Sequence, residues 1–392
     1  MRETVAAACV VAAFFAQACA ASPAPTALPP PTAPSSPPTE SAAPPPAPSA
    51  SAAPAPAPAE RARPVPPPPE GERGTADGLA RGNGEPGDRE LALGDTAYEQ
   101  EKYKEARAHY RKAEQLAPKD PAPKVGLVRV GVAEADLPLD YAAAPRDGRI
   151  PPLLKQLEAA LKLDPDFGPA LLERGHLLLI QGKAEPALAS LERAASLMPQ
   201  HAEAQSALGV AAMATGKTKE ALPYFERAAA LDRDNADRLG NLGAAYLLLG
   251  RTADAIGAFE KAANLAPNEA RYQSDLGTAY LAQNQLERAL AALKRAVALD
   301  PKRASYLSNL SYAYQLSADF ERALASAEQA TQLDPKLGSA WLNLGTAQAK
   351  RGELDRAEAA FKRALALDPE DPRARANLEE LAELRKQKPK PP

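Results

Sequence analysis

Two glycine-containing segments are the strongest candidates for nucleotide chemistry in this sequence. Residues 82–87 read GNGEPG and satisfy the GxGxxG pattern with which some folds hold a dinucleotide pyrophosphate. That pattern needs a strand before it and a helix opening from it, whereas here no strand precedes it and Pro86 interrupts it. Residues 214–218 read ATGKT, like the end of a phosphate-binding loop, but Ala211 stands where such a loop has its first glycine. We interpret both segments as turn or linker.

Metal-binding and catalytic groups do not form a recognisable set either. His109, His176 and His201 have no metal-ligand spacing between them, and no pair of carboxylates stands out for acid–base catalysis. Both cysteines, Cys9 and Cys19, lie in the first twenty residues, so the rest of the chain contains no thiol. The sequence therefore predicts a protein that is not an enzyme, with no metal site and no cofactor.

Composition favours helices and excludes some partners. The chain has 392 residues and a formal net charge of −3, which does not call for nucleic acid or an anionic membrane face as a partner. After the first 90 or so residues it is rich in Ala, Leu, Glu, Arg and Lys, the residues that favour helices. These elements would have to position any functional side chains.

The N-terminus is typical of an export signal, predicted over residues 1–18. Arg2 precedes an apolar run at 5–16 that is too short to span a bilayer. Two processing routes fit: residues 18–20 (ACA) match the small-x-small pattern of signal peptidase, and residues 16–19 (AQAC) resemble a bacterial lipobox that would lipidate Cys19. We favour the lipobox because a proline-rich tether follows it. The expected location is the outer membrane, anchored and facing the periplasm, and otherwise the periplasm or the medium.

Residues 19–86 are predicted to be a disordered linker rich in proline and alanine. Proline runs such as 44–46 and 66–69 cannot donate backbone hydrogen bonds and favour polyproline II. At about 3.1 Å per residue, the stretch 23–69 would extend over roughly 145 Å. We interpret it as a spacer, and a proline-rich ligand for another protein is the alternative.

A period of 34 residues organises the rest of the chain. Leu-Asp-Pro or a near variant recurs at this spacing or its double, with its proline at Pro165, Pro199, Pro267, Pro301, Pro335 and Pro369. Within the unit 236–269, Leu242, Gly243 and Tyr246 share one face of a first helix, and Ala255 and Phe259 share one face of a second. These residues resemble the tetratricopeptide repeat (TPR), whose W-x2-L-G-x2-Y…A-x3-F…P pattern they reproduce.

The resemblance implies an all-α, right-handed α-solenoid of about eight helix-turn-helix units. The expected units are 87–120, 121–167, 168–201, 202–235, 236–269, 270–303, 304–337 and 338–371. The second unit carries an insertion at 136–151 between helices expected at 121–135 and 152–163; the insertion is either a tolerated loop or an arm for partner contact. A capping helix is expected at 372–386 and a short tail at 387–392.

The resemblance also implies a concave groove lined by the first helix of each repeat. Position 6 of that helix, which faces the groove in the family, is Asn241, Asp275, Asn309 and Asn343. A side-chain amide both donates and accepts hydrogen bonds, so such a row could hold the backbone of an extended peptide. The other groove candidates are Arg271, Ser274, Thr278, Ser308, Tyr312, Gln315 and Lys350.

The expected function is therefore a non-catalytic scaffold or adaptor of the bacterial cell envelope that binds other proteins in this groove. Membrane contact would come only through the lipid at Cys19. An assembly factor for pilus or outer-membrane machinery, and a subunit that presents substrates to a separate enzyme, are the alternatives.

Overall fold

The computed structural model describes residues 78–81, 87–137 and 144–387. The predictions on the signal, on Cys19 and on most of the linker fall in residues 1–77, outside the described residues. The end of the tail, 388–392, and the centre of the insertion, 138–143, also lie outside them.

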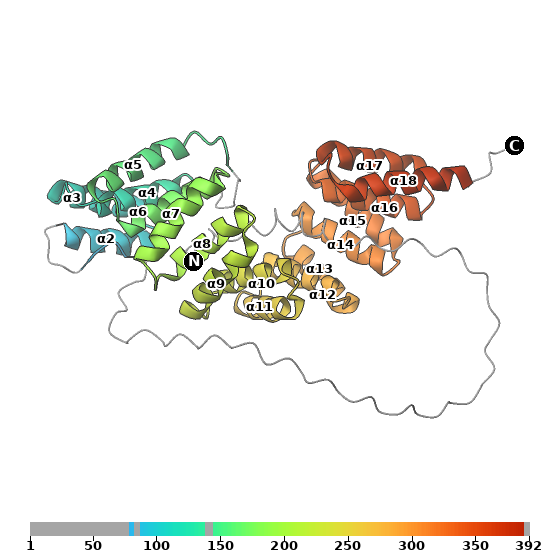
Figure 1. Cartoon of the computed structure of the whole chain (residues 1–392), viewed down its shortest axis with the longest axis horizontal. Coiled ribbons are helices and arrows are strands. Elements are labelled where there is room, and N and C mark those ends of the chain that lie inside the picture. The colour runs from blue at the N-terminus through green and yellow to red at the C-terminus, as the bar shows by residue number, and fades with distance from the viewer. Residues whose placement is uncertain (1–77, 82–86, 138–143, 388–392) are drawn as a thin grey trace, which may run out of the picture.

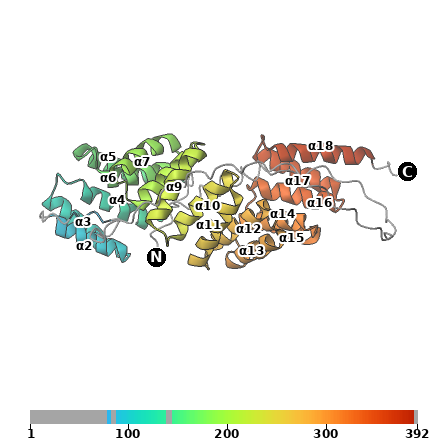
Figure 2. The same ribbon diagram turned by 60° about the horizontal axis from the view of Figure 1, so that its bottom comes forward.

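Within the described ranges every regular element is an α-helix, and the helices succeed one another as packed pairs (Figures 1 and 2). The first helices are α2 (Asp88–Glu99), α4 (Ala122–Glu134), α6 (Gly168–Ile180), α8 (Ala202–Ala214), α10 (Ala236–Leu248), α12 (Ala270–Ala282), α14 (Ala304–Leu316) and α16 (Gly338–Lys350). The second helices are α3 (Tyr103–Leu116), α5 (Ile150–Leu163), α7 (Ala184–Leu197), α9 (Thr218–Leu231), α11 (Thr252–Leu265), α13 (Leu286–Leu299), α15 (Phe320–Leu333) and α17 (Leu354–Leu367). The last helix is α18 (Pro372–Gln387). The predicted all-α solenoid of paired helices is confirmed.

A left-handed residue separates the two helices of a pair. Gly250 has φ +74° and ends α10, with its N–H donating to the Leu247 carbonyl at 3.0 Å and the next N–H donating to the Tyr246 carbonyl at 2.8 Å. Glycine fills this turn in four pairs, but Asn284 and Ala318 occupy it after α12 and α14 with φ of 58° and 59°. The turn geometry therefore repeats even where the glycine does not.

Glycines on the first helices make room for side chains of the second. A Cβ atom on Gly243 would lie 2.8 Å from the ring of Phe259, which is fully buried. The unit 304–337 departs from this pattern, with Ser311 in place of the glycine and Ala327 in place of the ring. Both are fully buried, and the Ser311 hydroxyl donates to the Ala323 carbonyl at 2.8 Å. The smaller partner leaves the space that the larger serine occupies.

The insertion lengthens the connection between the two helices of the second pair. Helix α5 begins at Ile150, two residues earlier than predicted, and the connection from α4 covers 135–149. The Ala144 N–H donates to the Ile180 carbonyl of α6 at 3.1 Å, so the end of the connection is tied to the next unit.

Helix α18 covers the end of the solenoid. Ala374 and Leu381 are buried against Phe361 and Leu342, which closes the apolar side of the last pair. None of the described helices combines the length and the apolar character that a bilayer crossing requires.

Candidate binding groove

The asparagines at position 6 join each repeat to the one before it. The Asn309 amide donates to the Ser274 hydroxyl at 3.3 Å, and the Asn343 amide donates to the Ser308 hydroxyl at 3.1 Å and to its carbonyl at 2.9 Å. Both asparagines are half-buried, whereas the two serines are buried. The row therefore forms a ladder of hydrogen bonds between first helices, with the acceptor 35 residues upstream in each case.

Asn241 repeats this contact at greater depth. It is 1 % exposed and donates to the Ser206 hydroxyl at 3.2 Å. Its carbonyl oxygen is buried and has no hydrogen-bond partner among the described residues. A groove ligand reaches this side chain only if the surrounding residues move.

Asp275 interrupts the ladder. The residue 35 positions upstream is Gly240, which offers no hydroxyl, and a Cβ there would lie 2.9 Å from the ring of Tyr272. Burial raises the pKa of the half-buried Asp275 carboxyl to about 7, against the opposing charge of Arg271. Asp275 is therefore the one position-6 residue of the predicted row whose charge changes near neutral pH.

Three further predicted groove residues are engaged inside the protein. Arg271 forms an ion pair with Asp237 and donates to the Tyr272 hydroxyl at 2.7 Å, and that hydroxyl donates to Asp237 at 2.7 Å. The Thr278 hydroxyl donates to the carbonyl of Ser274 at 3.0 Å, and both residues are buried. The contacts with Asp237 join α10 to α12, whereas the Thr278–Ser274 bond lies within α12.

Accessible groups gather on α14 and α16. Tyr312 is 37 % exposed and Lys350 is also exposed. Gln315 is half-buried and donates to the backbone carbonyl of Asn343 at 3.0 Å, which joins the two helices beneath them. Of the residues proposed from the sequence, Tyr312 and Lys350 are the ones most open to a ligand.

An ion-pair chain along α4, α6, α8 and α10 was not predicted. Arg129 Nε lies 2.7 Å from Glu173, whose other oxygen lies 3.7 Å from His176 Nδ1. His176 Nε2 lies 3.1 Å from Glu203, which also pairs with Arg238. All five side chains are largely buried. The sequence signal that could have found this chain is charged residues on successive first helices, but their pairing depends on how the repeats stack.

The ion-pair chain stabilises the charged forms of its five side chains. Burial lowers the pKa of His176, but the neighbouring Glu173 and Glu203 carboxylates outweigh burial and raise that pKa to about 10. Burial raises the pKa of Glu173, yet Arg129 and His176 outweigh it and bring the pKa to about 2. His176 is thus a cation between two carboxylates at neutral pH. No group of three or more potential metal ligands occurs among residues 78–81, 87–137 and 144–387.

Sequence comparison finds one family along the chain. Models described as "Tetratricopeptide repeat" match residues 91–120, 172–236, 212–274 and 314–372, and one described as "TPR repeat" matches 277–317. Together these models cover more than half of the chain. A comparison with curated proteins found no significant match.

Comparison with solved structures gives a match with a TM-score above 0.5, and it has the same fold. The structure titled "Crystal structure of APC/C hetero-tetramer Cut9-Hcn1" matches 78 % of this chain with a TM-score of 0.57 and 17 % identity. This chain spans 58 % of that chain's length. The structure titled "Functional Characterization of Pseudomonas Aeruginosa pilF" matches 56 % of this chain and 98 % of its own, with 20 % identity and a TM-score of 0.48. The chain belongs to the tetratricopeptide-repeat family.

Proposed function

We propose that this protein is a non-catalytic scaffold that binds an extended segment of another protein along its first helices, with the main contacts on α14 and α16. The observation that carries the proposal is the exposed pair Tyr312 and Lys350 above a wall of hydrogen-bonded side chains. Aromatic residues in a surface depression are frequent anchors of protein interfaces because they bury a large area at low entropic cost.

The ladder supports this role by limiting movement of the wall. Asn309 and Asn343 are already bonded to the preceding repeat, so a ligand does not have to order them. The Asn309 amide uses one of its two protons in this way and has the other for a further hydrogen bond. The Asn343 amide donates twice to Ser308, so a ligand would bond to its carbonyl oxygen as an acceptor. A groove ordered in advance costs less entropy on binding.

The binding test compares two pairs of substitutions in the full chain used as bait for envelope extracts. Tyr312→Ala with Lys350→Ala removes the exposed groove groups. Gln332→Ala with Arg363→Ala removes two exposed groups on the second helices α15 and α17. The proposal is supported if a stoichiometric partner of the unaltered chain no longer binds the chain with the groove pair of substitutions but still binds the chain with the control pair. Equal retention of that partner by both pairs contradicts it.

We propose further that the chain acts in the bacterial cell envelope as a lipoprotein. The support is the segment 16–19 and the tether after it, both outside the described residues. Mass spectrometry of the mature N-terminus tests it: a diacylglyceryl group on Cys19 is expected, and an unmodified N-terminus after residue 18 or 20 contradicts lipidation.

A further inference from the structure

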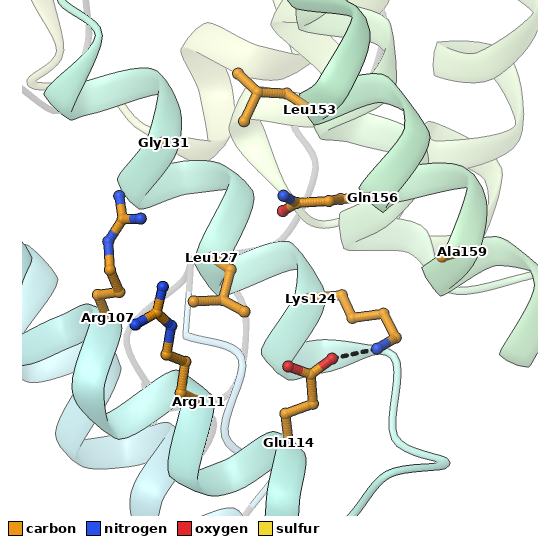
Figure 3. A pocket seen from close by; sticks show the side chains of 9 residues that line it. All are labelled: Arg107, Arg111, Glu114, Lys124, Leu127, Gly131, Leu153, Gln156 and Ala159. Atoms are coloured by element: carbon orange, nitrogen blue, oxygen red, sulfur yellow. Dashed lines mark hydrogen bonds and ion pairs between the residues drawn. The ribbon is translucent and has the colours of Figure 1, made fainter.

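A cavity of about 320 Å³ lies between α3, α4 and α5, where the insertion separates the helices of the second pair. It is lined by two second helices and one side of α4, whereas the predicted groove residues all lie on first helices. Figure 3 shows Arg107 and Arg111 of α3 facing Gln156 and Leu153 of α5, with Leu127 of α4 between them. The other lining residues are Glu114, Lys124, Gly131 and Ala159.

A large residue stands at a normally small position in the lining of the cavity. Leu153 of α5 occupies the position that is alanine in every other second helix, namely Ala106, Ala187, Ala221, Ala255, Ala289, Ala323 and Ala357. These alanines are fully buried, because the two helices of a pair cross there. Leu153 instead meets Gly131, where an added Cβ would lie 2.7 Å from its side chain. Leu153 and Gly131 therefore replace the usual alanine at the α4–α5 crossing, and both residues line the cavity.

Charged residues line this space at positions that are apolar in most other second helices. Arg107 occupies the position of Leu188, Ile256 and Leu290, all of which are buried in their own units. Glu114 occupies the position of Ala195, Ala229 and Ala263, which are also buried. The helix face that is buried on several later second helices is thus charged and accessible on α3.

The lining has an excess of positive charge over an apolar floor. Arg107 pairs with Glu134, and Lys124 pairs with Glu114. Arg111 is exposed and makes no ion pair within the described part of the chain. Three cations therefore line the cavity against one carboxylate, with Leu127 and Leu153 beneath them. Arginine binds carboxylates through two parallel hydrogen bonds, which makes Arg111 the strongest recognition group.

We propose that this cavity is a second binding site, which takes an acidic segment of a partner protein. An apolar side chain of the segment packs against Leu127 and Leu153, and an adjacent carboxylate pairs with Arg111. Its volume lies at the lower end of the range of about 300–1,000 Å³ for ligand pockets, which suits a few side chains of a peptide. The apolar floor distinguishes it from a site for a free inorganic anion.

The test measures binding of a fluorescein-labelled peptide of alternating Leu and Glu to the full chain by fluorescence anisotropy at low salt. Arg111→Glu reverses the unpaired charge, and Ala159→Trp fills the cavity from the exposed side of α5 without changing charge. We expect each to weaken binding by at least about tenfold. Arg363→Glu makes the same charge change at an exposed position of α17 and is expected to bind like the unaltered chain.

Three further measurements define the ligand and the site. A peptide of alternating Leu and Gln should not bind, and inorganic phosphate at matched ionic strength should not displace the acidic peptide. The Tyr312→Ala, Lys350→Ala chain should bind the peptide unchanged, so this site and the groove can fail separately. Circular dichroism confirms that each variant is folded. No saturable binding, equal binding by Arg111→Glu or Ala159→Trp, or displacement by phosphate overturns the proposal.

Discussion

Some side chains on the first helices join successive repeats, and others face solvent. Asn309 and Asn343 donate to the preceding repeat, whereas Tyr312 and Lys350 are exposed beside them. Farther towards the N-terminus, the first helices α4, α6, α8 and α10 carry the buried ion-pair chain that centres on His176. Successive repeats are therefore joined by asparagine–serine hydrogen bonds and by buried ion pairs, and both kinds of contact occur between α8 and α10.

The ion-pair chain should be costly to break. Glu203→Gln removes the charge that faces both His176 and Arg238. We expect the free energy of unfolding to fall by about 2–4 kcal/mol, because two largely buried cations each lose their nearest carboxylate and keep only the more distant Glu173 or Asp232. Urea unfolding at pH 6 measures this. Glu321→Gln is the control, since Glu321 is 78 % exposed and pairs with the surface residue Arg351, and its loss should cost at most about 0.5 kcal/mol. Equal losses of unfolding free energy in the two variants would show that the ion-pair chain adds no stability beyond that of a surface ion pair.

Asp275 should make stability depend on pH in an unusual direction. Its pKa in the folded state, about 7, lies above the unfolded value of about 3.9, so ionisation disfavours the fold progressively as pH rises from about 4 to 7. We expect Asp275→Asn to be more stable than the unaltered chain by on the order of 1 kcal/mol at pH 8, with the gain vanishing near pH 4. Unfolding curves at both pH values check this.

The exposed Asp234 provides the matched control for that experiment. Asp234→Asn should change stability little at either pH. A gain from Asp275→Asn that is the same at pH 4 and pH 8 would mean that the carboxyl's ionisation is not its cause.

Sequence patterns predicted a row of groove residues but not the contacts that those residues make. The 34-residue period places Asn241, Asn309 and Asn343 at equivalent positions. It does not say that each amide meets a serine 35 residues earlier, because that contact depends on the rotation between successive repeats. The same limit hid the ion-pair chain through His176, whose members lie on four different helices.

At the scale of elements, the left-handed turn between the two helices of a pair is kept even where the residue that forms it changes. Ala318 adopts φ +59° after α14, where the corresponding residue after α16 is Gly352 with φ +80°. Period and helix faces predicted the pairs, since these follow from local spacing. Exceptions such as Ser311 with Ala327, or α5 beginning at Ile150, depend on pairwise packing and on the insertion, which local spacing does not report.

Reciprocal substitutions test the turn. Ala318→Gly should raise the free energy of unfolding by about 0.5–1 kcal/mol, because glycine has no Cβ to disfavour the left-handed region. Gly352→Ala should lower it by a similar amount, and an added Cβ there meets no heavy atom within 4 Å, so strain is the only cause. Thermal unfolding of both variants gives the measurement. Changes of the same sign would contradict this account of the turns.

In the whole molecule each repeat contacts mainly its neighbours, so each repeat is stabilised by its interfaces with the adjacent repeats. Figures 1 and 2 show α18 as the last member of that row. Damage at this end should therefore loosen the nearest helices first, and distant repeats least.

Leu381→Asp places a charge in the buried contact of α18 with the last pair. We expect amide hydrogen exchange to speed up in α16 and α17 and to stay unchanged in α6–α9. Glu379→Gln, at an exposed position of the same helix, should leave exchange unchanged throughout. Uniform acceleration along all repeats would show that the solenoid unfolds as one unit.

The most direct test of the groove as a binding surface is site-specific photocrosslinking in the intact chain. A photoactivatable phenylalanine analogue placed at Tyr312 or at Lys350 should capture the same single protein, through one contiguous peptide of it. The analogue at the exposed Gln332 of α15 should capture nothing above background. If Gln332 gives that adduct as strongly as Tyr312 and Lys350 do, or if neither groove position gives one, the partner does not bind along α14 and α16.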